Sequence, residues 1–205
     1  RFLVPFDSFE NGSRLSNGSD RIKLEDASNS TIREFTYKDG PRWPAEADGN
    51  GFSIVLMKPT SNPDHDSPGN WRGSVFPGGS PGDSDGESFA GNPDEDLDGD
   101  GYGAFFEYAT GSSDAVPGGS PLFLAEGPED RLVLTFKINQ GADEVSHRLM
   151  LSTDLRNWTE AGADYTLLSR VNNGDGTATL VYQSPPGSVN SLVDRRFLRV
   201  EFTLP

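Results

Sequence analysis

Apolar residues in this chain occur in short alternating runs between clusters of turn residues, a pattern that predicts β-strands rather than helices. Before residue 83 the pattern predicts strands at 2–4, 21–24, 31–37 and 52–57. In the strand at 31–37 we expect Ile32 to face inward, together with Phe35 and Tyr37. Two Asn-Gly pairs precede the second of these strands, and this dipeptide is a strong turn signal.

The same pattern returns after residue 122. The expected strands there are 131–137, 145–152, 165–168, 177–182 and 196–202. The sequence Asn-Gly-Asp-Gly at 173–176 predicts a hairpin turn, and the spacing of the strands predicts a small antiparallel sandwich. One short helix is expected at 104–110, with Gly111 as its C-terminal cap.

The composition agrees with a β-rich chain that has many turns. Glycine and proline together supply 39 of the 205 residues. We therefore expect an all-β fold, with two β-rich modules on either side of an acidic linker at 84–121. The stretch 83–93 is rich in Gly, Ser, Asp and Pro without periodicity, which is typical of a linker.

The negative charge is concentrated in one segment. The net charge is -15, and no Lys or Arg lies between Arg72 and Arg131, an interval that carries 13 of the 32 acidic residues. The remaining 19 acidic residues face 17 basic ones, so the rest of the chain is nearly neutral. Nucleic acid is a poor partner for such a chain because its binding needs clustered cations, and an anionic membrane surface is disfavoured for the same reason.

The chain has no cysteine, which excludes disulfides, thiolate metal sites and cysteine nucleophiles. No apolar run approaches the roughly 18 residues that a membrane-spanning helix needs. Secretion stays open without disulfides, because a bound calcium ion can stabilise a small domain in their place. We expect the protein to be secreted or displayed at the cell surface.

The strongest motif in the acidic segment matches the twelve-residue EF-hand-like calcium loop. The expected ligands are the carboxylates of Asp96, Asp98, Asp100 and Glu107 and the backbone carbonyl of Tyr102. Gly101 stands where the loop needs a sharp turn, and Asp94 is a further candidate ligand. The carboxylates repel one another, and a divalent cation removes that cost while their oxygens fill its shell. The expected cofactor is therefore calcium.

The flanking sequence indicates which type of calcium loop this motif forms. The incoming helix of an EF-hand is not expected, because 89–94 contains Gly, Asn and Pro. The motif resembles dockerin-type and thrombospondin-type calcium loops, which implies a structural site rather than a sensor. With one supporting helix we expect an affinity of about 10⁻⁴ to 10⁻³ M, the range of extracellular modules.

The segment 1–83 resembles the bacterial lamin-tail-like domains. Five motifs carry the resemblance in the same order: 14–26, Trp43-Pro44, 47–56, Asn70-Trp71 and 78–82. The resemblance implies an immunoglobulin-like β-sandwich. Such domains usually begin with further strands before the motif at 14–26, so we expect either that the front of the sandwich was removed or that another protein segment completes it. An incomplete sandwich exposes a strand edge, which is adhesive.

The segment 122–205 resembles a C-terminal β module of exported proteins of the Verrucomicrobia and Planctomycetes type. The motifs are 152–158 and 195–199. The resemblance implies export and carries no activity with it.

Trp43, Trp71 and Trp158 have two interpretations. As in β-sandwich carbohydrate-binding modules, their rings could stack on a sugar, which makes Trp43 and Trp71 candidate ligand-binding residues. As core or loop anchors they would instead be covered by other side chains. All three lie in the motifs of the two resemblances, which favours anchors.

Signals for catalysis are weak. Gly-Gly-Ser-Pro-Gly at 78–82 matches the nucleophile elbow in letters only, because that elbow needs a preceding strand and a following helix. His65 and His147 are the two histidines, and a surface position is the default for each. A hydrolase would need carboxylates such as Asp48 and Asp64 to share a cleft. We expect no enzymatic activity.

These observations lead to two hypotheses of different classes. The first is a non-enzymatic, exported structural or adhesion segment in which calcium stiffens the joint between two β modules. The alternative is an accessory glycan-binding module of a larger secreted enzyme. The expected partners are a calcium ion, and either a protein segment that completes the N-terminal sandwich or a surface glycan.

Overall fold

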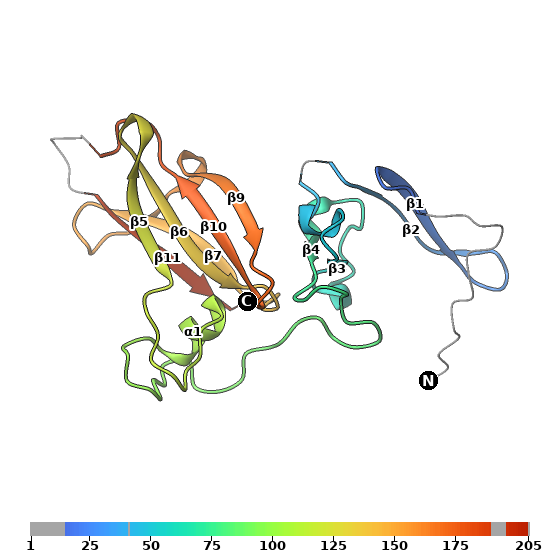
Figure 1. Cartoon of the computed structure of the whole chain (residues 1–205), viewed down its shortest axis with the longest axis horizontal. Coiled ribbons are helices and arrows are strands. Elements are labelled where there is room, and N and C mark those ends of the chain that lie inside the picture. The colour runs from blue at the N-terminus through green and yellow to red at the C-terminus, as the bar shows by residue number, and fades with distance from the viewer. Residues whose placement is uncertain (1–14, 41, 190–195, 205) are drawn as a thin grey trace. The chain divides into compact units, whose positions relative to one another are not determined.

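The computed structural model describes residues 15–40, 42–189 and 196–204, and Figure 1 shows its elements. The protein is mostly β, with antiparallel sheets and one α-helix in the described part of the chain, which confirms the expected all-β class. By contacts the chain divides into two compact units, Arg1–Gly73 and Ser74–Pro205. None of the described helices is long and apolar enough to cross a membrane.

The first unit contains two small antiparallel sheets. Strand β1 (Ser19–Glu25) pairs with β2 (Thr31–Lys38), and β3 (Ile54–Leu56) pairs with β4 (Trp71–Gly73). The predicted strands at 21–24 and 31–37 are confirmed, and the one at 52–57 is shorter than expected. The predicted strand at 2–4 lies outside the described residues. The two sheets are separate, so the immunoglobulin-like sandwich stays a prediction.

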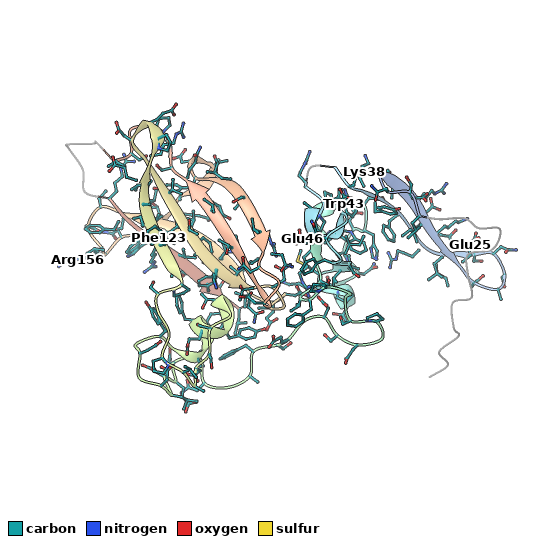
Figure 2. All side chains as sticks on the ribbon, in the orientation of Figure 1. Glu25, Lys38, Trp43, Glu46, Phe123 and Arg156 are labelled. Atoms are coloured by element: carbon teal, nitrogen blue, oxygen red, sulfur yellow. The ribbon has the colours of Figure 1, made fainter. Side chains whose placement is uncertain are left out.

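Three aromatic rings pack together in the first unit, where Figure 2 labels Trp43. Trp71 stacks on Phe35 at a centroid distance of 5.1 Å and lies 6.1 Å from Trp43. The indole Nε1–H of Trp71 also donates a 2.9 Å hydrogen bond to the carbonyl of His65. Trp43 is only 9% exposed. These contacts give the first unit an aromatic core.

The expectation that Ile32 faces inward is wrong, since its side chain is 58% exposed. Successive side chains of a strand point to opposite faces, so residues 32 and 35 cannot share one. Phe35 and Tyr37 are half-buried, and they lie on the face opposite Ile32. The strand itself was predicted correctly. The error was to expect residues 32, 35 and 37 to face inward together, although residue 32 lies on the opposite face from the other two.

The second unit is built from two antiparallel sheets. The four-stranded sheet has the order β5 (Leu122–Gly127), β6 (Arg131–Asn139), β10 (Thr177–Gln183) and β9 (Thr166–Asn172). The three-stranded sheet has the order β11 (Phe197–Thr203), β7 (Ser146–Ser152) and β8 (Thr159–Glu160). All five predicted strands are present. Strands β5 and β8 were not predicted, and neither was β4 of the first unit.

Side chains from both of these sheets form one hydrophobic core. Its buried members are Leu134, Phe136, Leu149, Ala161, Ala178 and Leu180. The Phe136 ring is fully buried, stacks at 5.9 Å on Tyr182 and meets Phe202 edge-on at 6.2 Å. Because β6, β7, β10 and β11 all contribute, this core holds the two sheets together.

The single α-helix, α1 (Ala104–Thr110), lies at one end of the second unit (Figure 1). It ends as predicted at Gly111, whose φ of 73° is the left-handed conformation that glycine adopts most readily. A Cβ at Gly111 would lie 2.6 Å from the Thr177 side chain, so the helix end is tightly packed against β10. On another face of the helix, Phe106 meets Phe202 of β11 edge-on at 5.8 Å.

The stretch 83–93, expected as a linker, is hydrogen-bonded to the rest of the second unit. The N–H of Glu87 donates to the carbonyl of Gly141 at 3.0 Å, and the N–H of Phe89 donates to the Glu144 carboxylate at 2.8 Å. By contacts, 84–121 therefore belongs to the second unit. The division into a module at 1–83, a linker at 84–121 and a module at 122–205 stays a prediction about sequence families.

Candidate metal centre

The three loop aspartates are held by backbone N–H groups of the loop itself. Asp96 accepts hydrogen bonds from the N–H groups of Gly99 at 2.8 Å and Gly101 at 3.1 Å. Asp98 and Asp100 each accept one from the residue two positions later, at 3.0 and 2.9 Å. Gly101 has a φ of 95°, which supplies the sharp turn that the motif requires. Backbone N–H groups of the loop therefore surround its carboxylates.

These hydrogen bonds bring the three side chains together. One carboxylate oxygen from each of Asp96, Asp98 and Asp100 lies within 4.8 Å of the other two. Asp96 is exposed, whereas Asp98 and Asp100 are half-buried. Asp94 is exposed and is not part of this three-residue group. The predicted aspartates at 96, 98 and 100 therefore converge, and the further candidate at 94 does not join them.

Glu107, in the first turn of α1, has the most unusual surroundings of the predicted ligands. Its side chain is 1% exposed, and neither carboxylate oxygen has a hydrogen-bond partner among the described residues. Oδ2 of Asp98 is buried in the same way. A buried charge without a hydrogen bond or counterion is strongly unfavourable, so such groups need an explanation.

The pKa of Glu107 is raised above its ordinary value. Burial is the main cause, because desolvation disfavours the charged form, and the carboxylates of Asp98, Asp100 and Asp114 add to the shift by repulsion. Glu107 is not part of the three-residue group whose oxygens lie within 4.8 Å of one another, so its role as a ligand stays a prediction.

The backbone on both sides of the loop is fixed. The N–H of Ala104 donates to the carbonyl of Glu95 at 2.7 Å, and the N–H of Phe105 donates to that of Pro93 at 3.2 Å, which closes the loop at its base. The Tyr102 ring stacks on Phe106 at 4.9 Å. Tyr102 is thereby held in the loop, and the role of its carbonyl as a ligand stays a prediction.

A segment after the helix completes the surroundings of the site, and the motif did not predict it. We call residues 112–118 the clasp. The Asp114 carboxylate accepts a hydrogen bond from the N–H of Leu97 at 3.0 Å, and the N–H of Gly118 donates to the Asp100 carboxylate at 2.9 Å. The only sequence signal was an acidic residue that falls seven positions after Glu107 in a loop without Lys or Arg.

The donor set suits a hard cation. All side chains that converge here offer carboxylate oxygens, which are the ligands that calcium and magnesium prefer. The buried, unpartnered oxygens of Glu107 and Asp98 are the observation that fits a bound ion best, because a cation would satisfy them.

The tryptophans lie in packed environments. Trp43 and Trp71 belong to the aromatic core of the first unit, where burial of Trp43 leaves little of its ring for a sugar. In the second unit the Arg199 guanidinium lies over the Trp158 ring, 4.2 Å from its centroid, so a cation already covers one face. The arrangement favours anchors over a sugar-binding platform.

The pattern at 78–82 does not form a nucleophile elbow. Residues 76–82 are irregular, with neither a strand before the serine nor a helix after it. The Ser80 hydroxyl donates to the Asp85 carboxylate at 2.8 Å. In the first unit, Asp48 lines a pocket of about 360 Å³, and Asp64 is not among the residues that line it. This pocket therefore does not bring Asp48 and Asp64 together.

His147, the second histidine, is part of the core rather than a surface residue. Its Nε2 lies 3.0 Å from the Tyr182 hydroxyl, and its ring meets Phe136 edge-on at 5.4 Å. Burial lowers its pKa below the ordinary value of 6.5, and the positive charge of Arg170 lowers it further. The folded protein therefore holds His147 neutral at physiological pH.

The lowered pKa makes a prediction about stability. As pH falls, His147 takes up a proton at a higher pH in the unfolded chain than in the folded protein. The contribution of neutral His147 to the free energy of unfolding is therefore complete above pH 6.5, and it is lost as pH falls through the pKa of His147 in the folded protein. We expect wild type to lose more stability than His147→Gln between pH 8 and pH 5. Urea unfolding at both pH values measures the difference, and equal losses would contradict the prediction.

Comparison of this chain with family models, with curated proteins and with solved structures gave no match. The resemblances to lamin-tail-like domains, to dockerin-type and thrombospondin-type loops and to the C-terminal module of exported proteins therefore stay predictions. The chemistry of the site is argued from its own geometry.

Proposed function

We propose that this protein is a non-enzymatic structural segment of an exported or cell-surface protein, and that its acidic loop binds a calcium ion. The observation that carries the proposal is Glu107, a carboxylate that is 1% exposed and has no described hydrogen-bond partner. Repulsion from the loop carboxylates of Asp98 and Asp100 adds to burial in raising its pKa. A cation at this place turns the unfavourable arrangement into a set of ligands.

Calcium is the favoured ion for two reasons. The ligands are a flexible set of carboxylates with one glutamate able to bind through both oxygens, which suits the larger shell of calcium better than the tight octahedron of magnesium. A site of about 10⁻⁴ to 10⁻³ M affinity is filled where calcium is abundant, which is the case outside cells. This is the basis for placing the protein in an exported setting.

The proposed mechanism is electrostatic. Without the ion, repulsion between the carboxylates favours an open loop. With the ion, the loop, α1 and the clasp close together, and the packed end of the helix at Gly111 attaches them to β10. Calcium would thereby stiffen the chain between the β strands of the first unit and those of the second, as a joint in a structural or adhesive protein requires.

Chelation is the direct test. If the site binds calcium at about 10⁻⁴ to 10⁻³ M, then about 10 mM calcium stabilises the folded state by about 1–3 kcal/mol relative to EGTA. We expect a rise in Tm of about 3–10 °C. An endoprotease that cleaves after acidic residues should cut the 83–121 segment faster in EGTA than in calcium, because ion binding closes the loop.

Two variants serve as a matched pair for this test. Asp98→Asn removes a ligand whose Oδ2 is buried without a partner, and it should abolish the calcium response. Asp83→Asn removes the same charge from an exposed side chain outside the cluster, and it should respond as wild type does. If wild type has the same Tm and the same cleavage rate in calcium as in EGTA, the proposal is wrong.

A further inference from the structure

The loop motif accounts for four carboxylates, and the structure holds a fifth, that of Asp114, beside the loop. Asp114 belongs to the clasp, which follows α1 in the sequence. Its carboxylate is half-buried, and Oδ1 accepts a 3.0 Å hydrogen bond from the N–H of Leu97, the second residue of the loop. That hydrogen bond fixes the group beside the loop.

The Asp114 carboxylate also acts on Glu107. Glu107 is 1% exposed, and neither of its carboxylate oxygens has a hydrogen-bond partner among the described residues. Repulsion from Asp114 is one of the causes that raise the pKa of Glu107, so the two carboxylates are near each other. Little water reaches Glu107 to screen this repulsion, and a bound cation would relieve it.

The protein supplies no cation of its own near this pair in sequence. No Lys or Arg lies between Arg72 and Arg131, and none of the described ion pairs involves an acidic residue of the loop or the clasp. The carboxylates of Asp96, Asp98 and Asp100 converge, and Asp114 is held beside the same loop. A multivalent cation from solvent would relieve the repulsion among these groups and the buried Glu107, because each carboxylate can offer it an oxygen.

We infer that Asp114 is a ligand of the same metal ion, supplied from outside the twelve-residue loop. The inference rests on the proposed calcium site and extends it. With Asp96, Asp98, Asp100 and Glu107, it gives the ion five carboxylates, a set that favours calcium and the trivalent lanthanides. The N–H of Leu97 holds the Asp114 carboxylate, and the Asp100 carboxylate holds the N–H of Gly118. Binding of the ion would therefore be coupled to closure of the clasp on the loop.

Calcium titration of the full 205-residue chain by calorimetry tests the inference. Asp114→Asn keeps an oxygen that can accept the Leu97 hydrogen bond and removes the charge. We expect this variant to bind calcium about tenfold more weakly than wild type, which corresponds to about 1.4 kcal/mol. The control is Glu95→Gln, an exposed acid beside the loop, which should stay within about twofold of wild type.

The outcomes separate the two proposals. If wild type binds calcium and Asp114→Asn binds it equally well, the inference about Asp114 is wrong and the proposed calcium site stands. If wild type binds no calcium, both are wrong. A tenfold loss in Asp114→Asn with an unchanged control supports both.

A second measurement covers the case in which Asp114→Asn affects the fold. Terbium binds calcium sites and reports the number of coordinated waters through its luminescence lifetimes in H₂O and D₂O, and the nearby Tyr102 can sensitise it. In Asp114→Ala we expect at least one more coordinated water than in wild type, since solvent replaces the lost ligand. An unchanged water count in a variant that still binds terbium would overturn the inference.

Discussion

Glu107→Gln is expected to lose calcium binding and at the same time to make the metal-free protein more stable. The calcium affinity should fall about a hundredfold or more, because the glutamate that closes such a loop binds the ion through both oxygens. In EGTA, Tm should rise by about 3–10 °C, because the neutral amide no longer places an uncompensated charge in a 1% exposed position, an effect of about 1–3 kcal/mol.

Calorimetric titration and thermal melting in EGTA measure the two effects. Glu126→Gln on β5 is the matched control, since its side chain is exposed and should leave both quantities unchanged. A Glu107→Gln protein that still binds calcium as wild type does would contradict the role of Glu107 as a ligand. One that melts lower than wild type in EGTA would contradict the cost of its buried charge.

The largest loss of stability is expected for Phe136→Ala. Phe136 is fully buried in the core of the second unit, where its ring lies 5.9 Å from Tyr182, 5.4 Å from His147 and 6.2 Å from Phe202. Removing a buried phenylalanine ring loses its transfer free energy and leaves a cavity between the sheets, which together cost about 3–5 kcal/mol. The variant should unfold at a much lower urea concentration.

The neighbouring strand offers a matched control. Phe123 on β5, labelled in Figure 2, is 68% exposed, so Phe123→Ala should change the free energy of unfolding by only about 0.5 kcal/mol. Urea unfolding of both variants, followed by near-ultraviolet circular dichroism, makes the comparison. If the two substitutions cost the same, Phe136 is not at the centre of the core.

The strands that the sequence predicted are those with a clear alternation of apolar and polar residues. In β6 and β10 this alternation places Phe136 and Leu180 opposite each other on the core face, as the register confirms. Strand β5 was missed because Leu122, Phe123 and Leu124 are apolar without alternation and follow a Gly- and Pro-rich stretch. The paired sheet, rather than the local pattern, makes this segment a strand.

At the candidate metal centre, too, the sequence predicted local features but not those that depend on packing. Asp96, Asp98 and Asp100 are two residues apart, so one loop conformation brings them together, and spacing was enough to predict the cluster. Asp114 reaches the site only because α1 ends at Gly111 and the chain then folds back over the loop. No regular spacing of residues in the sequence predicts that the chain folds back in this way. The depth at which Glu107 is buried was likewise invisible, because packing decides it.

The packing of Gly111 against Thr177 bears on whether the acidic loop can be used as a portable calcium-binding cassette. A Cβ at Gly111 would lie 2.6 Å from the Thr177 side chain, so the end of α1 packs closely against this part of β10. A graft of the twelve loop residues alone would leave behind this docking surface, the burial of Glu107 and the clasp. The transplantable unit is therefore the loop together with the sheet on which it rests, and recombination between proteins is expected to preserve both or neither.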